Sequence, residues 1–145
     1  MSTQNQKAPN DPGAKALRRA LESADIRPTR QRMIIASIML EKPQHLSADQ
    51  VMALANRRDR WVSKATVYNT LSLFARKGLL REVIVDPTRV FYDSNTSEHH
   101  HLYNEDDGSL TDISFESLRL GAMPAPPPGT EVLGVDVIVR VRRAP

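Results

Sequence analysis

Three consecutive histidines, His99–His101, are the residues of this chain best suited to metal chemistry. They are three of its four histidines, and the stretch around them is rich in carboxylate and amide side chains. The 145 residues include no cysteine, which excludes thiolate ligands, disulfides within the chain and cysteine nucleophiles. Imidazole together with carboxylate suits iron, manganese or zinc, or the iron of a haem. The triplet therefore predicts a metal or haem site without sulfur ligands.

The geometry of an extended chain predicts which of these histidines act together. Side chains alternate between the faces of a strand, so His99 and His101 would point one way and His100 the other. Two imidazoles at this spacing are close enough to share one metal ion. Carboxylates from elsewhere could complete the shell, with Asp93 and Asp112 as the candidates on either side of the triplet, and His45 would tie the helical half to the site. A solvated polar loop with three idle histidines is the alternative interpretation.

An enzyme is a second alternative, because two histidines and a carboxylate also form the facial triad of non-haem iron oxygenases. Such an enzyme needs a sizeable enclosed pocket, and the residues after 82 leave little room for one. Neither a glycine-rich phosphate loop nor a nucleophile elbow occurs in the sequence. We therefore expect a protein that is not an enzyme.

Charge is unevenly distributed along the chain, although the net formal charge is only +3. Residues 1–82 contain 15 Lys and Arg against 7 Asp and Glu, whereas residues 83–145 contain 5 against 10. A basic half favours a polyanionic partner such as DNA, and an acidic half favours cation chemistry. Solvation of helix faces would also account for these charges. No apolar run approaches the ~18 residues of a membrane span, and we expect a cytoplasmic protein without a membrane partner.

The basic half has the pattern of a winged helix-turn-helix domain over residues 13–86, after a disordered polar arm over residues 1–12. Apolar residues at helical spacing predict helices over 14–24, 30–41, 48–58 and 64–77. Thr29, Ser47 and Ser63 are placed to cap the last three, and Gly78 to end the fourth. Alternating runs over 80–85 and 89–93 then predict a hairpin.

The helix predicted over residues 64–77 presents polar side chains that suit the major groove of DNA. Tyr68 can contact a thymine methyl group or a phosphate, and Asn69 suits an adenine edge. Flanking cations would contact phosphates. The candidate DNA-binding residues are Arg27, Arg30, Arg32, Lys64, Thr66, Tyr68, Asn69 and Arg76. A plain amphipathic helix is the alternative.

The acidic half predicts a second, smaller set of elements, which makes the chain α+β. After the triplet we expect a strand over 110–113, a short helix over 115–121, a proline-rich connector over 124–129 and a last strand over 135–142. Valines alternate with charged residues in that last strand except at Ile138. This exception indicates burial on both faces.

Several motifs together resemble the ferric uptake regulator family over nearly the whole chain, from residue 15 to residue 142. They are Pro-Thr-Arg-Gln-Arg at 28–32, His-Leu-Ser-Ala-Asp at 45–49, Lys-Ala-Thr-Val-Tyr-Asn-Thr-Leu at 64–71, and Tyr-Asp at 92–93 ahead of the triplet. The chain is most similar to the iron response regulator branch of that family, through residues 91–96, 103–106 and 135–142.

This resemblance implies an N-terminal DNA-binding domain, a hinge over residues 87–95 and a C-terminal α/β dimerisation domain over residues 96–145. It places the family's DNA-contacting tyrosine on Tyr68. Asn104 and Asp107 stand where the family's structural zinc usually has its first cysteine pair, so no cysteine-ligated zinc is expected. The resemblance places the regulatory metal site on His45, Asp93, His99, His101 and Asp112.

The branch further implies a homodimer that binds a double-stranded DNA operator and regulates iron and haem metabolism. The regulator would act when iron is scarce and would be released from DNA by haem. An enzyme that delivers haem is a further partner that the resemblance implies. Some members carry an N-terminal Cys-Pro haem motif, which is missing here, so haem would fall on His99, His100 and His101. Sensing of manganese, iron or peroxide through the same ligands remains the alternative.

Overall fold

The chain folds into two compact units, Met1–Thr96 and Ser97–Pro145, and each is described by itself. The structure is a computed structural model that describes residues 12–58 and 62–145. Helices dominate the first unit and strands the second, so the predicted α+β class is confirmed. No helix in the described part of the chain is long and apolar enough to cross a bilayer. Of the predicted N-terminal arm, only Pro12 falls among the described residues.

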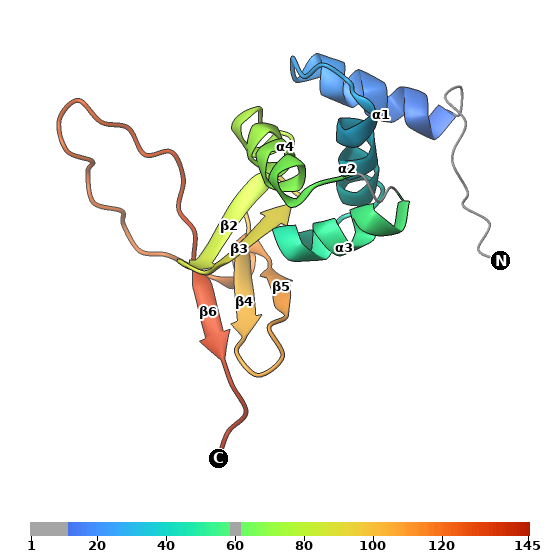
Figure 1. The fold of residues 1–145 in the computed structure, drawn as a ribbon. Coiled ribbons are helices and arrows are strands. Elements are labelled where there is room, and N and C mark those ends of the chain that lie inside the picture. The colour runs from blue at the N-terminus through green and yellow to red at the C-terminus, as the bar shows by residue number, and fades with distance from the viewer. Residues whose placement is uncertain (1–11, 59–61) are drawn as a thin grey trace. The chain divides into compact units, whose positions relative to one another are not determined.

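Four helices lie in the part of the first unit that the structure describes (Figure 1), and each begins and ends within two residues of its predicted bounds. They are α1 (Pro12–Ser23), α2 (Arg30–Leu40), α3 (Ala48–Arg58) and α4 (Lys64–Arg76). The predicted caps of α2 and α4 are present. The Thr29 hydroxyl accepts the Arg32 amide at 3.2 Å, and the Ser63 hydroxyl accepts the Thr66 amide at 3.1 Å.

Reciprocal hydrogen bonds fix the start of α3, and a glycine fixes the end of α4. Ser47 Oγ accepts the Gln50 amide at 3.2 Å, while Gln50 Oε1 accepts the Ser47 amide at 2.9 Å, as predicted for a capping box. Gly78 has a φ of +80°, and the amide of Leu79 donates to the carbonyl of Phe74 at 2.9 Å. A left-handed residue here favours glycine and closes the helix in a Schellman arrangement.

A three-stranded antiparallel sheet completes the first unit, in the order β1-β3-β2. Its strands are β1 (His45–Ser47), β2 (Arg81–Asp86) and β3 (Arg89–Asp93). The hairpin of β2 and β3 was expected, but β1 was not, because three residues are too few to show an alternation. Ser94 helps to hold β1, since its amide donates to the Gln44 carbonyl and its hydroxyl accepts the Gln44 amide, both at 3.0 Å.

The core of the first unit lies where α2, α3 and α4 meet. Ile35, Val51, Val67, Leu71 and Phe74 are all fully buried in it. Tyr92 brings β3 into this core, and burial raises the pKa of its hydroxyl, partly offset by a hydrogen bond with Ser72 of α4. The unit therefore holds α4 on one side by apolar packing and leaves its other face open to solvent.

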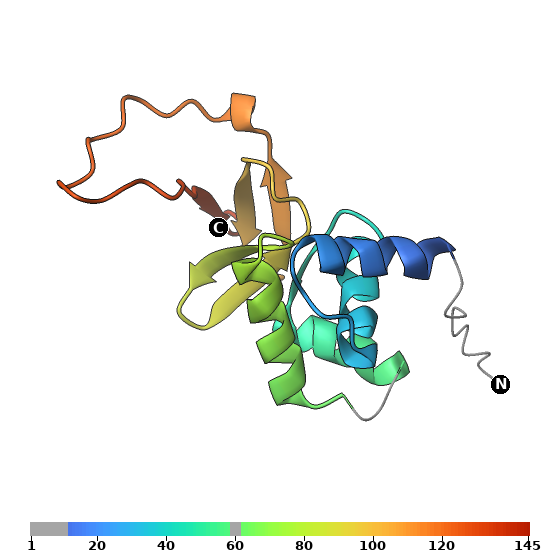
Figure 2. The ribbon, with the colours of Figure 1, turned by 90° about the horizontal axis from the view of Figure 1, so that it is seen from above.

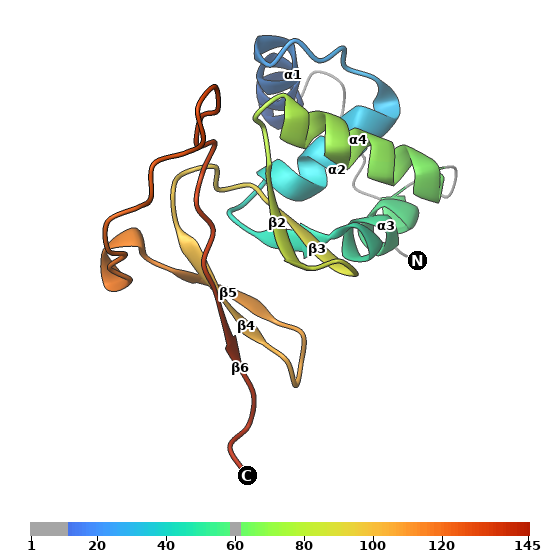
Figure 3. The ribbon, with the colours of Figure 1, turned by 90° about the vertical axis from the view of Figure 1, so that its left-hand side faces the viewer.

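The second unit is a smaller sheet in the order β5-β4-β6 (Figure 3). Its strands are β4 (His100–Asn104), β5 (Leu110–Ile113) and β6 (Ile138–Val141). β4 and β5 form an antiparallel hairpin, whereas β6 runs parallel to β4. Gly108, with a φ of +72°, ends the hairpin turn and donates its amide to the Asn104 carbonyl at 2.8 Å.

Two expectations for the chain around this sheet were wrong. The helix predicted over 115–121 is only the 3-10 turn η1 (Phe115–Ser117), and residues 118–137 form a long excursion without helix or strand (Figure 2). Gly121 and the prolines from Pro124 onward disfavour a continuing helix. The last strand is confined to β6, and Val139 is 36% exposed, so burial on both faces is not found in the single chain. The stretch 87–95 expected as a hinge includes β3, and the units divide after Thr96; its role as a hinge stays a prediction.

Candidate metal centre

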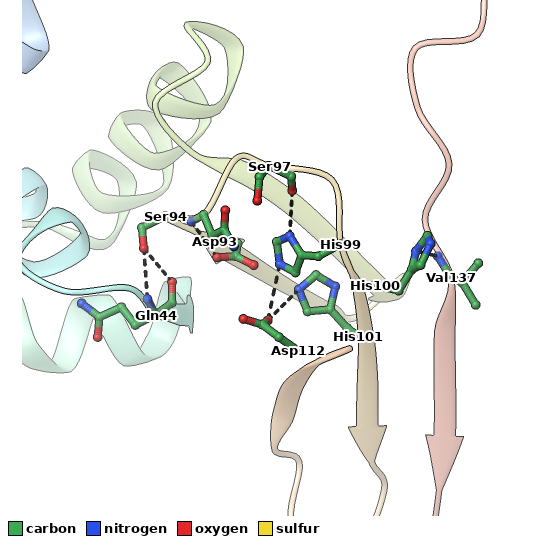
Figure 4. A network of polar contacts seen from close by, with 10 residues as sticks. Gln44, Asp93, Ser94, Ser97, His99, His100, His101, Asp112 and Val137 are labelled. Carbon is green, nitrogen blue, oxygen red and sulfur yellow. Dashed lines mark hydrogen bonds and ion pairs between the residues drawn. The ribbon is translucent and has the colours of Figure 1, made fainter. Parts of the chain in front are cut away.

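Two histidines and one carboxylate converge at the start of β4 (Figure 4). His101 and Asp112 are partners across the β4–β5 ladder, and His99 lies one alternation earlier. Nε2 of His99 and Nε2 of His101 each lie 3.4 Å from the same oxygen, Oδ1 of Asp112. The two rings meet edge to face, with centroids 4.5 Å apart. The predicted alternation is therefore observed, and this cluster is called the His99–His101–Asp112 cluster below.

The tautomer of His99 follows from its second ring nitrogen. Nδ1 of His99 lies 2.7 Å from the carbonyl oxygen of Ser97, and a carbonyl oxygen can only accept a hydrogen bond. Nδ1 therefore carries a proton, which in the neutral ring leaves a lone pair on Nε2. That lone pair is directed at the Asp112 carboxylate, which is also an acceptor. Two acceptors in this position favour a cation between them, either a proton or a metal ion.

The spacing of the cluster fits a small transition-metal ion. Ligand atoms on neighbouring corners of a tetrahedral ion, with bonds of about 2.0–2.2 Å, are about 3.3–3.6 Å apart. The two histidine-to-aspartate distances of 3.4 Å lie in that range. His99 and His101 are 5% and 1% exposed, whereas the Asp112 side chain is 51% exposed, so an ion has a route from solvent. The carbonyl of Ser97 orients His99 as second-shell acceptors orient zinc-bound histidines.

The other two predicted metal ligands lie together in the first unit. His45 of β1 and Asp93 of β3 are direct partners in the antiparallel register. Side chains of such partners share one face of the sheet, with Cβ atoms about 4.5–5.5 Å apart. Asp93 Oδ1 also accepts the amide of Asn95 at 2.9 Å, which helps to fix its carboxylate. The first unit thus presents an imidazole and a carboxylate side by side.

His100 lies apart from this cluster, on the other face of β4. Its Nδ1 accepts the amide of Val137 at 3.2 Å, and its ring is stacked against Phe115 at a centroid distance of 6.2 Å. Ser97 and Val137, which touch the triplet through backbone groups, were missed by the sequence reasoning. Backbone contacts of this kind leave no trace in residue type, so no signal in the sequence would have found them.

Among the predicted DNA-binding residues, Lys64 and Tyr68 lie together on the open face of α4. Lys64 Nζ lies 5.7 Å from the centroid of the Tyr68 ring, and Tyr68 is 38% exposed. The Tyr68 hydroxyl donates to Asp49 Oδ1 of α3 at 3.3 Å. Asn69 is exposed next to Tyr68, while Thr66 is half-buried and accepts a hydrogen bond from Ser63. Asp49, which steadies the tyrosine, was not among the predicted residues.

The predicted arginines fall into two places. Arg27 and Arg32 are joined at the start of α2, where the Arg32 guanidinium donates to the Arg27 carbonyl at 2.9 Å, and Arg30 begins that helix. Arg76 is at the last turn of α4, about 18 Å along the helix axis from Lys64 at 1.5 Å per residue. Arg76 and Lys64 therefore mark opposite ends of one helix.

Comparison with known proteins agrees with this architecture. A model of the ferric uptake regulator family matches residues 23–122. The peroxide-responsive repressor PerR of Staphylococcus epidermidis is 28% identical over 99 residues, which are 68% of this chain and 66% of that protein. The ferric uptake regulator of Pseudomonas aeruginosa, solved with manganese, superposes with a TM-score of 0.62 at 22% identity, over 86% of this chain and 96% of that one. The ferric uptake regulator of Vibrio cholerae superposes with a TM-score of 0.65 at 17% identity, over 87% of this chain and 98% of that one.

Fold and site together define an α+β protein with a helical unit, a small sheet unit and a histidine–carboxylate cluster fit for a divalent metal. The chain belongs to the ferric uptake regulator family. The members of this family are metal-responsive transcriptional regulators. The match spans 100 of the 145 residues and includes the whole cluster.

Proposed function

We propose that this protein is a metal-responsive transcriptional regulator that binds operator DNA as a homodimer in the cytoplasm, and is not an enzyme. The His99–His101–Asp112 cluster carries the proposal, because an imidazole lone pair directed at a carboxylate favours a metal cation between them. The basic composition of residues 1–82 and the polar face of α4 support DNA binding.

We further propose that His45 and Asp93 complete the metal coordination from the first unit. An imidazole and a carboxylate paired across β1 and β3 suit the same ion as the cluster in the second unit. A metal held by both units would bind one arrangement of the two units more tightly than others. By linkage, the bound metal and the bound operator would then favour each other. When bound, the metal supplies a fixed positive charge and a set of directed bonds.

The test is a selection of operator sequences from random duplex DNA with the full-length protein. We expect enrichment of one sequence in the presence of Mn²⁺, Fe²⁺ or Zn²⁺, and loss of binding on chelation. Binding should also weaken steeply between about 50 and 200 mM salt, because several phosphates are engaged. Metal binding without any selected sequence, or selection that is indifferent to chelator, would contradict the proposed function.

Replacing Tyr68 by alanine should weaken operator binding by about 1–3 kcal/mol, the usual cost of losing a contact to a base. Tyr68→Phe separates the ring from the hydroxyl. If the ring packs against a base, phenylalanine keeps most of the affinity; if the hydroxyl binds a phosphate, phenylalanine loses about 0.5–1.5 kcal/mol. Gel-shift titrations would measure the operator affinity of each variant, provided that its unfolding midpoint equals that of the unmodified protein. Operator affinity that is unchanged in Tyr68→Ala would place another element in the groove.

Iron scarcity and haem are the finer part of the proposal. We propose that the protein acts when iron is scarce and that haem releases it from DNA, supported by the resemblance of residues 91–96 and the triplet to the iron response regulator branch. His99 fits haem iron as a ligand, because its Nε2 is the unprotonated nitrogen. His100 does not fit in the tautomer found here. Haem would then compete with the metal ion for the cluster, and a haem absorption titration with and without Zn²⁺ tests this.

Peroxide sensing is the second candidate, favoured by the similarity to the peroxide-responsive repressor of Staphylococcus epidermidis. The two candidates differ in what releases the operator. Release by haem in the absence of oxidant supports the first. Release of the iron-loaded protein by hydrogen peroxide, with no response to haem, supports the second.

A further inference from the structure

His100 is a buried histidine with one ring nitrogen engaged and the other without a partner. Only 3% of the residue is exposed. Nδ1 accepts the Val137 amide, whereas Nε2 has no hydrogen-bond partner among the residues that the structure describes. Buried polar atoms are satisfied in the great majority of cases, so an exception calls for an explanation.

The Val137 amide fixes the tautomer of this ring. A backbone N–H can only donate, so Nδ1 of His100 must offer its lone pair. The neutral ring then carries its proton on Nε2, which has no lone pair left for a metal. His99 has the opposite tautomer, because the Ser97 carbonyl requires a proton on Nδ1. The neighbouring rings therefore differ in which nitrogen has the lone pair, Nε2 in His99 and Nδ1 in His100.

Val137 is held to β4 through both of its backbone polar groups. Its amide donates to His100, and its carbonyl accepts the amide of His101 at 3.1 Å. Val137 is also the last residue of the excursion 118–137, immediately before β6. This pair of hydrogen bonds, called the Val137 clamp below, therefore fastens the returning chain to the strand that carries the metal cluster.

We infer that His100 is a positioning residue and not a ligand: through the Val137 clamp it fixes β4 and so orients His99 and His101. The effect on metal binding rests on the proposed function, whereas the hydrogen bonds of the clamp do not depend on it. A Lewis acid could take Nε2 only if the Nε2 proton left to solvent while Nδ1 took one up. The new Nδ1–H would then face the Val137 N–H, and the clamp would lose its hydrogen bond to His100. Capture of His100 by haem iron would therefore leave Val137 held to β4 through its carbonyl alone.

Two variants distinguish positioning from ligation. Asparagine places an amide oxygen near the position of Nδ1, whereas glutamine places its amide near the position of Nε2. We expect His100→Asn to bind Co²⁺ as the unmodified protein does, with the same visible absorption spectrum. We expect His100→Gln to bind Co²⁺ about 10–100-fold more weakly, as second-shell losses do. The reverse order would make His100 a ligand through Nε2, and equal affinity in both variants would remove any role for the clamp.

A measurement on the unmodified protein keeps the inference testable if a variant fails to fold. Imidazole ¹⁵N chemical shifts should show His100 protonated at Nε2, and the Val137 amide should exchange slowly with solvent. A His100 ring protonated at Nδ1, or a Val137 amide that exchanges freely, would overturn the inference. These readouts need no metal. If Co²⁺ fails to bind the unmodified protein, the proposed function is contradicted. The chemical shifts and the amide exchange then still show whether the Val137 clamp exists.

Discussion

The double variant His99→Ala with His101→Ala will lose metal binding by more than about 100-fold, beyond the 10–100-fold range of second-shell changes. The two imidazoles supply two of the three ligand atoms that converge in the second unit, so that unit keeps only the Asp112 carboxylate. Operator binding should then no longer respond to added metal. Isothermal titration with Zn²⁺ or Mn²⁺, followed by gel shifts with and without metal, measures both effects.

Removal of two buried rings also leaves cavities, which can destabilise the fold. A variant that removes a ligand without leaving a cavity is therefore needed to separate the two effects. Asp112→Asn has this property, because the Asp112 side chain is 51% exposed and the amide keeps its shape. It should weaken metal binding without lowering the unfolding midpoint. Glu105→Gln is the matched control, since it removes an exposed carboxylate from the nearby turn. Unaltered metal titrations in both the double variant and Asp112→Asn would place the metal elsewhere.

Most of the first unit could be predicted from the sequence because its determinants are local. A helix cap needs a side-chain hydroxyl that can accept the backbone N–H three residues later. Thr29, Ser47 and Ser63 meet that condition. The end of α4 depends on one left-handed residue, which Gly78 supplies. Signals of this kind span four or five residues, so they are visible without knowledge of the fold.

The second unit was predicted less well because its order depends on contacts distant in sequence. β6 is defined by pairing with β4, some 37 residues earlier, as in the Ile138–His101 register. Valine alternation over 135–142 indicates an extended chain but not how much of it finds a partner. The three residues of β1 gain their strand character in the same way, through β3.

The metal cluster shows both situations. The separation of His99 and His101 from His100 follows from strand alternation, which the sequence predicts. That Asp112 joins His101 requires the β4–β5 register, and that His45 pairs with Asp93 requires β1. The different tautomers of His99 and His100 depend on the backbone groups of Ser97 and Val137, which sequence patterns do not contain.

The largest stability effect is expected from Phe74→Ala in the first unit. Phe74 is fully buried on the core-facing side of α4, and its carbonyl accepts the Leu79 amide that closes the helix. Loss of a buried phenylalanine ring costs about 3–5 kcal/mol, a large part of the 5–15 kcal/mol that usually stabilises a domain. Urea unfolding followed by circular dichroism measures this change. Ile84→Ala is the control, since Ile84 is 59% exposed and should change the free energy of unfolding by less than about 0.5 kcal/mol.

Phe74→Ala also tests whether the first unit supplies metal ligands. A ligand at 100 times its Kd stabilises the state that binds it by about 2.7 kcal/mol. If His45 and Asp93 coordinate the ion, metal should recover most of the stability that Phe74→Ala loses, because both strands that carry them belong to the weakened unit. Asp93→Asn in the Phe74→Ala background should abolish the recovery. No recovery in Phe74→Ala itself would confine the ligands to the second unit, and the coupling between metal and operator would then need another origin. Recovery that persists without the Asp93 carboxylate would mean that a group of the first unit other than Asp93 holds the ion.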